Sequence, residues 1–428
     1  MMSWILNTSR RVAGLAVALS VLGTAACGDF LEVEDPGRFT DDALNTPLAL
    51  NAVANGVEGD LWGVYDDFAT FHGLMSDEFQ HTGTWAQWED MDQGRLGPGI
   101  GTDNGVFNSI VGRRTAALNA VDRFNKVMGD SAGRSVLMAR VVTMQGWIEL
   151  LLGQHACEGP KEAFGEIISD SELYAQAIPF LTQGATIAQQ AGNTEYQRVA
   201  LAGRARAKLF TGDLAGALAD AQTIPDDFAY FAKFSETGTS NGITSLAHYS
   251  RLKAGGLDPL QQARVDTVAG FMRDPYTNEV DHRLQFTRKA NGADGVKKFY
   301  GQEKYTTLAD DIRMTSGWEM RLIEAEVYMK QNNLVQAVTQ INKVRAHAGL
   351  TAHATTGLTA NQVRDYLLWE RFAELYLEGH RLNDLYRFNL VGTVLGHDRA
   401  TKFPMSSNEI TLNPHVNGNT AGRCPTMS

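Results

Sequence analysis

The sequence has few of the residues and motifs that mark metal, redox or nucleic-acid sites. It contains only 3 cysteines in 428 residues, with no C-x-x-C pair, and its 10 histidines form no H-E-x-x-H motif. These patterns support no transition-metal site, and we expect neither a metal nor a cofactor. The formal net charge of -11 and the lack of a Lys/Arg-rich run argue against a nucleic-acid partner, because the phosphate backbone attracts basic surfaces.

Recognisable catalytic motifs are also scarce. Residues 238–242, GTSNG, have the G-x-S-x-G spacing of a nucleophile elbow, but no strand pattern precedes them. We therefore interpret this segment as a loop. Gly97, Gly99 and Gly101 alternate without the Lys-Ser/Thr that completes a phosphate-binding loop. These motifs indicate no catalytic residue.

After the N-terminal region, no apolar run reaches the length of about 18 residues that a membrane span needs. The apolar segment 12–22 follows two arginines and precedes a run of small residues, which is the layout of a secretory signal. Cys27 comes directly after this site and resembles the cysteine that is acylated in bacterial lipoproteins. We expect a signal peptide over residues 1–26, a lipid on Cys27, and an acidic, extended tether over residues 27–40.

The other cysteines can form a pair. With Cys27 lipidated, Cys157 and Cys424 remain as an even pair in an exported protein, and we predict a disulfide bond between them. The alternative is two buried free thiols. On the chain-entropy model, a loop this long stabilises the fold by at most about 5 kcal/mol.

Hydrophobic periodicity separates helical segments from irregular ones. The apolar spacing predicts helices over residues 41–62, 106–126 and 131–152. Two stretches lack this spacing: residues 68–105 are rich in Gly, Asp, Gln and Trp, and residues 225–311 in Gly, Asp, Asn and Ser. We expect an irregular loop in the first and loops around short helices in the second.

An internal similarity indicates helical hairpins. Residues 205–221 and 325–341 align, with small residues at matching positions around a polar turn. Small residues at the crossing points let two helices pack closely, as in tetratricopeptide units. We expect such hairpins over residues 172–223 and 316–347, within a single α-helical domain that spans residues 41–428.

Charged residues recur every three or four positions among apolar ones in residues 369–388. Gly379 fits the left-handed C-cap of a first helix and predicts a break before a second, both within residues 361–391. The spacing of the acids and bases predicts a network on these helices. Its members are Glu370, Arg371, Glu374, Glu378, Gly379, Arg381, Asp384 and Arg387.

The acids of this network permit a functional and a structural interpretation. Glu374 and Glu378 could be a catalytic carboxylate pair. However, Arg371 lies three positions before Glu374, and Arg381 lies three positions after Glu378. Guanidinium partners would keep both acids ionised, whereas a general acid needs a raised pKa. We therefore interpret the segment as a structural network.

Several segments carry motifs that occur together in one family. The C-terminal network follows the pattern E-R, E-L, E-G-x-R, D-L-x-R. Residues 325–350 read A-E through N-x-V-R-x-x-x-G-L, residues 281–284 contain D-x-R-L, and residues 403–414 follow F-P…E…N-P. With the lipoprotein-like N-terminus, these motifs resemble the SusD/RagB family of outer-membrane nutrient-binding lipoproteins.

The resemblance implies an all-α, SusD-like fold in which tetratricopeptide-type hairpins form a scaffold and long irregular loops form a binding surface. It also implies a non-catalytic protein that is lipid-anchored in the outer membrane and faces the cell exterior. The implied partner is a SusC-like TonB-dependent transporter, which receives an oligosaccharide, a peptide or another small nutrient. Two alternatives stay open: an all-α glycan-degrading enzyme, and a helical-repeat adaptor for protein partners.

The irregular stretch 68–105 holds the candidate ligand-binding residues Trp85, Trp88, Asp77, Glu78 and Gln80. An indole can cover the apolar face of a sugar ring while polar side chains bind its hydroxyls. In an extended chain, Trp85 and Trp88 would face opposite sides, so only a turn would let both rings form one platform. The alternative is that both tryptophans fill the core or contact the transporter.

Overall fold

The computed structural model describes residues 41–97, 101–249 and 255–416. The predicted signal peptide, Cys27, the tether and Cys424 lie outside the described residues. Helix α2 (Asp41–Leu44) belongs to an N-terminal unit that ends at Ala49 and is described only by itself. All other described elements belong to one unit that starts at Leu50.

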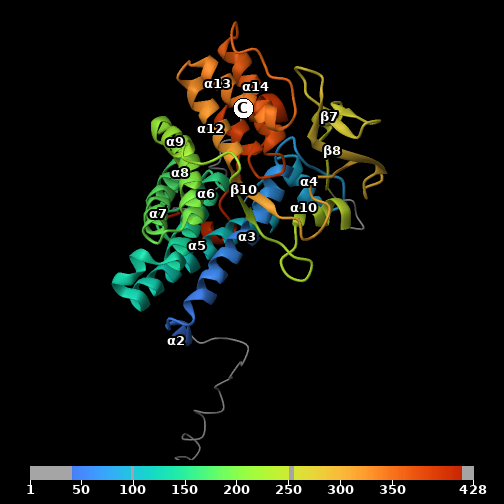
Figure 1. The fold of residues 1–428 in the computed structure, drawn as a ribbon. Helices are drawn as coiled ribbons and strands as arrows, with labels where there is room; N and C mark the ends of the chain where they lie inside the picture. The colour runs from blue at the N-terminus through green and yellow to red at the C-terminus, as the bar shows by residue number, and fades with distance from the viewer. Residues whose placement is uncertain (1–40, 98–100, 250–254, 417–428) are drawn as a thin grey trace, which may run out of the picture. The chain divides into compact units, whose positions relative to one another are not determined.

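The first half of this unit is a group of helices around α6 (Val136–His155), which is buried along almost its whole length. It packs against α3 (Leu50–Leu74), α5 (Gly101–Met128), α7 (Asp170–Gln190) and α8 (Thr194–Thr211) (Figure 1). Among the described residues, α6 is the helix with the length and apolar composition of a membrane span, yet 83% of its apolar window is buried in the protein. A core helix has this composition because it is apolar on every side.

Short elements connect these helices. The 3₁₀ helix η1 (Gly129–Arg134) joins α5 to α6, and α9 (Leu214–Ala221) follows α8. Strand β2 (Glu158–Pro160) pairs antiparallel with β3 (Ile167–Ser169). Helix α7 then begins with a capping box, in which Ser169 and Glu172 satisfy each other's backbone N–H groups.

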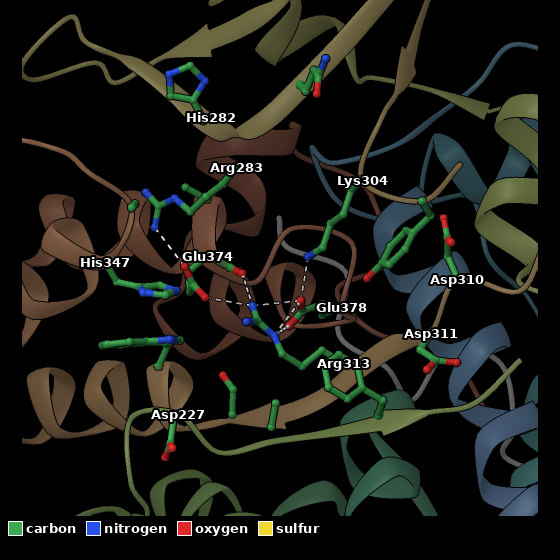
Figure 2. A pocket seen from close by; sticks show the side chains of 18 of the residues that line it. Asp227, His282, Arg283, Lys304, Asp310, Asp311, Arg313, His347, Glu374 and Glu378 are labelled. Atoms are coloured by element: carbon green, nitrogen blue, oxygen red, sulfur yellow. Dashed lines mark hydrogen bonds and ion pairs between the residues drawn. The ribbon is translucent and has the colours of Figure 1, made fainter. Parts of the chain in front are cut away.

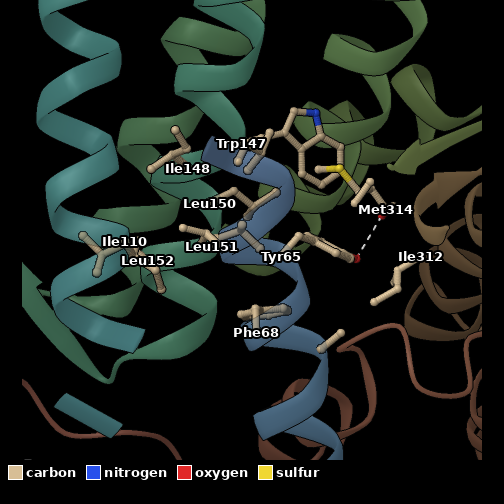
Figure 3. Packing of buried hydrophobic residues seen from close by; sticks show 14 of the residues in the cluster. Tyr65, Phe68, Ile110, Trp147, Ile148, Leu150, Leu151, Leu152, Ile312 and Met314 are labelled. Atoms are coloured by element: carbon tan, nitrogen blue, oxygen red, sulfur yellow. Dashed lines mark hydrogen bonds between the residues drawn. The ribbon is translucent and has the colours of Figure 1, made fainter. Parts of the chain in front are cut away.

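Glycines let the helices around α6 approach closely. A Cβ atom on Gly184 of α7 would lie 2.3 Å from Thr143 Oγ1 on α6, and one on Gly203 of α8 would lie 2.9 Å from the Trp147 ring. Trp147 is fully buried and donates to the Val199 carbonyl at 3.2 Å. Figure 3 shows the apolar side chains of α6 packed between α3 and α5, with the Tyr65 hydroxyl donating to the Met314 carbonyl on the far side of the core.

A two-stranded ladder attaches the second group of helices to the first. Strand β10 (Ile312–Ser316) pairs antiparallel with β4 (Ala229–Ala232). Helices α12 (Gly317–Lys330) and α13 (Leu334–His347) follow as a hairpin, and α14 (Ala360–Glu374) packs against both. Apolar side chains of α12, α13 and α14 form a separate core cluster. The prediction of a mainly helical fold is therefore confirmed.

Short helices complete the C-terminal part. They are α15 (Arg381–Arg387), α16 (Val391–Leu395) and α17 (Ser407–Leu412). Between α16 and α17 the chain returns to the first helical group, where Phe403 forms a parallel bridge with Ala156 at the end of α6.

The expectation of loops and short helices over residues 225–311 is wrong in one respect, because this stretch contains a four-stranded antiparallel sheet. The sheet has the order β6 (Val265–Asp266), β7 (Phe271–Arg273), β8 (Val280–Asn291) and β9 (Lys298–Gln302). Leu284 and Phe286 of β8 are buried at alternate positions, as in a strand. Asp281 of β8 is buried as well, and the register of β8 against β7 shifts between Asp281 and Gln285, so the buried positions do not follow one continuous two-residue period. The shorter elements here are α10 (Gly242–Thr244), η2 (Ser245–Tyr249), β5 (Gly255–Gly256) and α11 (Pro259–Gln262).

The boundaries predicted near residues 41–105 also change. The predicted helix over residues 41–62 is broken between α2 and α3, where Thr46-Pro47 interrupts it. Helix α3 instead continues to Leu74, so the start of the predicted loop 68–105 is helical. Its last turns are buried on all sides, and a helix of this kind has no polar face to reveal its period.

Candidate ligand-binding site around helix α4

A short helix places the two candidate tryptophans together. Trp85 is the N-cap residue of α4 (Ala86–Asp92), and Trp88 lies one turn further along. Their ring centroids are 5.6 Å apart with an interplanar angle of 58°. Trp85 is 44% exposed, whereas Trp88 is half-buried against Phe71. The helical turn thus supplies the geometry that an extended chain could not, because residues three apart share a helix face.

His81 extends this aromatic surface. Its ring lies 6.4 Å from that of Trp85 at an angle of 17° and 6.0 Å from that of Trp88. The imidazole Nε2 accepts a hydrogen bond from the Trp85 backbone N–H at 3.2 Å. His81 belongs to β1 (Gln80–His81), which pairs with β5. The orientation of the exposed indole is therefore supported by a paired strand.

A polar groove of about 620 Å³ runs beside α4. Gln80, Asp92 and Lys297 line it, together with Asp258, Glu89 and Arg399 among others. Lys297 forms an ion pair with Glu89 and donates to the His81 carbonyl at 2.9 Å. The aromatic surface of Trp85 and Trp88 and one side of the polar groove thus belong to the same short helix.

Burial changes the protonation of the groove acids. Burial raises the pKa of Asp92 to about 8, although Lys297, 3.8 Å away, lowers it in part. Burial also raises the pKa of Asp258 to about 6. Near neutral pH, Asp92 therefore holds a proton in part of the population and can both donate and accept hydrogen bonds.

Gln80 lines this groove and has a side-chain oxygen without a hydrogen-bond partner in the described part of the chain. This oxygen, Oε1, is buried. A buried acceptor without a partner costs free energy unless a water or a ligand satisfies it. Of the three polar candidates from the sequence, Gln80 is the one that the structure places at the groove.

The other two polar candidates do not face a ligand surface, and this part of the prediction is corrected. Asp77 is fully buried and accepts hydrogen bonds from Arg381 at 2.6 and 2.8 Å. Glu78 is also buried, and its Oε1 accepts from the Leu377 backbone N–H at 2.9 Å. Both acids instead connect the start of the loop to the C-terminal network. Their charge made them look like loop acids, because sequence alone does not reveal which arginine a distant acid meets.

The C-terminal network exists and contains the Asp384–Arg387 pair that i, i+3 spacing predicts, but the pairs of Arg371 and Arg381 differ from the prediction. Arg371 binds Asp384 at 2.6 Å instead of Glu374, and Arg381 binds Asp77 instead of Glu378. Gly379 has a φ of 79°, and a Cβ atom there would lie 2.5 Å from the Phe68 ring. The break between α14 and α15 therefore needs glycine both for its conformation and for the close approach of α3.

Cations from other segments pair with the two central acids. Arg283 of β8 and Arg313 of β10 contact Glu374 at 3.2 and 3.0 Å. Lys304 and Arg313 contact Glu378 at 2.7 and 3.1 Å. Figure 2 shows these cationic side chains pointing toward the two carboxylates. The network therefore joins the end of α14 to strands that are distant in the sequence.

The outer members of the network extend this connection. Arg283 also binds Glu370 at 2.5 Å, and Arg387 binds Glu326 of α12 at 2.6 Å. Arg387 further binds Asp384 at 2.8 Å. Among the described residues, no group of three or more His, Cys, Asp and Glu side chains is arranged to hold a metal ion.

The fold is mainly helical, and the exposed aromatic surface at α4 lies in a connection between the long helices α3 and α5. A family model described as the SusD family matches residues 295–420. This match covers the C-terminal part of the chain. A search of curated proteins found no match.

Solved structures share the fold at low sequence identity. A SusD superfamily protein from Bacteroides fragilis is 15% identical, with a TM-score of 0.65 over 86% of this chain and 98% of its own. A SusD-like carbohydrate binding protein from Bacteroides vulgatus is 15% identical, with a TM-score of 0.60 over 81% of this chain and 83% of its own. A putative sugar binding protein from Bacteroides vulgatus is also 15% identical, with a TM-score of 0.59 over 86% and 97% of the two chains.

Proposed function

We propose that the protein is a non-catalytic nutrient-binding protein of the cell surface. It captures an oligosaccharide on α4 and delivers it to a SusC-like TonB-dependent transporter in the outer membrane. The observation that carries this proposal is the exposed indole of Trp85, which lies beside Trp88 and a polar groove on the same helix.

The chemistry of this surface suits a sugar. One face of a pyranose presents C–H groups that pack on an indole, and its hydroxyls need hydrogen-bond donors and acceptors at the edge of the ring. Gln80 offers an acceptor without a partner in the described part of the chain, and Asp92 offers a carboxyl group that is partly protonated near neutral pH. Two solved proteins of similar fold are themselves described as carbohydrate or sugar binding.

The sequence supports the membrane part of the proposal. The signal-like segment ends just before Cys27, and a lipid on this residue would hold the protein at the outer membrane, facing the cell exterior. An anchored binding protein raises the local concentration of its ligand beside the transporter, which is the benefit of tethering.

The network around Glu374 and Glu378 argues against a glycan-degrading enzyme. Both acids contact Arg313, and each has a second cationic partner. A general acid must reach the substrate to give it a proton, whereas both carboxylates are occupied by ion pairs within the protein. This pair therefore suits a structural role.

Replacing Trp85 with alanine tests the proposal. We expect the variant to bind oligosaccharides at least about 10-fold more weakly, because loss of a buried aromatic contact costs about 1.5–3 kcal/mol. The measurement is isothermal titration calorimetry against a panel of neutral oligosaccharides, with binding confirmed first for the wild-type protein.

Tyr276 supplies a matched control, since its side chain is also 44% exposed but lies outside α4 and its groove. Tyr276→Ala should bind the same glycan like wild type. The proposed site would be overturned if Trp85→Ala bound the glycan as tightly as the wild type, or if the wild type bound no glycan.

A further inference from the structure

A second cavity, of about 890 Å³, lies above the C-terminal network (Figure 2). Its walls come from the turn before β4, from β8 and β10, from the segment after β9, and from the ends of α13 and α14. It shares no lining residue with the groove beside α4. It is therefore a separate site.

The floor of the cavity carries charges that already have partners. Arg283, Lys304 and Arg313 line it, and all three contact Glu374 or Glu378. Arg283 also pairs with Asp281 at 2.7 Å. These cations are engaged by carboxylates of the protein and are poorly placed to hold an acidic ligand.

The rim of the cavity is acidic. Figure 2 shows Asp227, Asp310 and Asp311 around its edge, and Glu303 also lines it. Asp311 pairs with Lys233 at 2.7 Å, but Asp227, Asp310 and Glu303 form no ion pair within the described residues. Asp310 accepts hydrogen bonds from Thr306 and Thr307, but no cation that the structure describes compensates its charge. The uncompensated charge at the cavity is therefore negative, which favours a cationic ligand.

A buried hydroxyl provides an independent sign of a ligand. Tyr305 lines the cavity and is only 4% exposed, yet its hydroxyl has no hydrogen-bond partner in the described part of the chain. Burial raises the pKa of Tyr305 well above its usual value, so the hydroxyl keeps its proton and can donate as well as accept. Leaving such a group unsatisfied is costly, and a ligand that reaches the floor would satisfy it.

An aromatic wall completes the cavity. The rings of Trp318 and His347 stack at 4.3 Å with an angle of 20°, and both residues line the cavity. An indole face attracts an ammonium or guanidinium group through its quadrupole. The acidic rim, the Trp318 indole and the Tyr305 hydroxyl thus all suit a ligand that carries a positive charge and a hydrogen-bonding group.

We propose that this cavity is a second binding site, for a small organic cation that carries an ammonium or guanidinium group next to a hydrogen-bonding group. The rim carboxylates attract the charge, Trp318 contacts the cation, and the Tyr305 hydroxyl binds the adjacent polar group. An amino sugar and a short basic peptide both present this chemistry. The site is independent of glycan capture at α4.

Calorimetric titration of the purified full-length chain tests this proposal. The probes are a glucosamine disaccharide and the tripeptide Gly-Lys-Gly, each beside its N-acetylated, uncharged form. We expect at least one ammonium-bearing probe to bind about 10-fold more tightly than its acetylated form, and to lose affinity as salt rises from 50 to 500 mM. The charged probe that binds more tightly shows whether the natural ligand is an amino sugar or a basic peptide. The proposal fails if neither charged probe binds, or if acetylation changes nothing.

Two conservative variants place the binding in this cavity. Tyr305→Phe removes the hydroxyl and Asp227→Asn removes an exposed charge, so both should fold normally while binding the charged probe about 5-fold or more weakly. Glu195→Gln, an exposed acid on α8, is the control and should bind like wild type. Wild-type affinity in either cavity variant would overturn the assignment.

Discussion

Glu78 shows how far burial alters a single acid. It was predicted to contact a ligand, but it lies inside the protein with a hydrogen bond from Leu377 to one oxygen. Its other oxygen, Oε2, has no hydrogen-bond partner within the described residues. Burial, more than the nearby charge of Asp77, raises the pKa of Glu78 to about 8. The folded protein therefore holds this proton more tightly than the unfolded chain does.

The sign of the pH effect follows from that difference. Between the unfolded value of 4.5 and the folded value of about 8, the folded state binds more protons at Glu78. Stability from this group is thus present at low pH and is lost as the pH rises through this range. We expect Glu78→Gln to give a free energy of unfolding that falls less steeply between pH 5 and 8.

Urea unfolding at pH 5, 6, 7 and 8 measures this effect. The control is Glu195→Gln, which changes an exposed acid and should keep the wild-type slope. Asp66 and Asp92 also have raised pKa values, of about 7 and 8, so part of the slope should remain in the Glu78 variant. Parallel stability curves for the wild type and the Glu78 variant would contradict the prediction.

Single residues were predictable by type but not by partner. The spacing of residues 369–388 indicated a charged network, and the network exists. However, helical spacing proposed Arg371 for Glu374, whereas the observed cations come from β8 and β10. Buried carboxylates pair with whichever cation the tertiary fold places in good geometry, and sequence separation does not enter that choice.

The positions of the long helices, unlike the partners of single residues, were largely predictable from the sequence. Periodic apolar spacing predicts helices over residues 106–126 and 131–152; the first lies within α5, whereas the second covers the end of η1 and most of α6, with a break at Ser135. The strand β8 was missed because buried Asp281 breaks its apolar alternation, and Arg283 compensates the charge at 2.7 Å. For Trp85 and Trp88, the sequence indicates only that a turn is needed to bring the two rings together. The helix α4 that does so is seven residues long, which is too short to show a clear apolar period.

The close crossing of α6 and α7 allows a prediction about helix packing. In Gly184→Ala, the new Cβ atom would lie 2.3 Å from Thr143 Oγ1 and 3.2 Å from the Thr143 backbone. Overpacking costs about 1–3 kcal/mol, whereas the better helix propensity of alanine returns at most about 1 kcal/mol. We expect a net loss of about 1–2 kcal/mol in the free energy of unfolding.

Gly112 of α5 is the matched control, because a Cβ atom there meets nothing within 4 Å and the residue is exposed. Gly112→Ala should therefore raise the free energy of unfolding by about 0.5–1 kcal/mol. Thermal and urea unfolding of both variants provide the comparison. A Gly184 variant as stable as the Gly112 variant would show that α6 and α7 can separate without cost.

At the scale of the whole molecule, long-range contacts join segments from both ends of the chain. Arg206 of α8 and Glu319 of α12 form a buried pair at 2.7 Å, close to the β4–β10 ladder. Lys402 is fully buried and reaches Asp170 at the start of α7 at 2.6 Å. Because the first and second helical groups share these contacts, we expect the unit from Leu50 onward to unfold as one cooperative structure.

A disulfide bond adds a covalent link to this arrangement. Cys157 forms a disulfide, whereas Cys27 and Cys424 lie outside the described residues, so the pairing with Cys424 stays a prediction. The Cys157 backbone N–H donates to the Phe403 carbonyl at 3.4 Å, which already holds the C-terminal segment beside the end of α6. A bond to Cys424 would add a covalent link between Cys157 and the part of the chain that follows this segment.

Serine substitution tests the pairing and its effect on stability. We expect Cys157→Ser and Cys424→Ser to lose the same free energy of unfolding, about 2–5 kcal/mol, because either change opens the same loop. A reducing agent should lower the stability of the wild type to that of the variants and leave the variants unchanged. Urea unfolding with and without reductant measures the loss, and peptide mapping under non-reducing conditions identifies the bond. Stability losses that differ between the two variants, or a Cys157 peptide joined to Cys27, would show that the C-terminus is not held by this link.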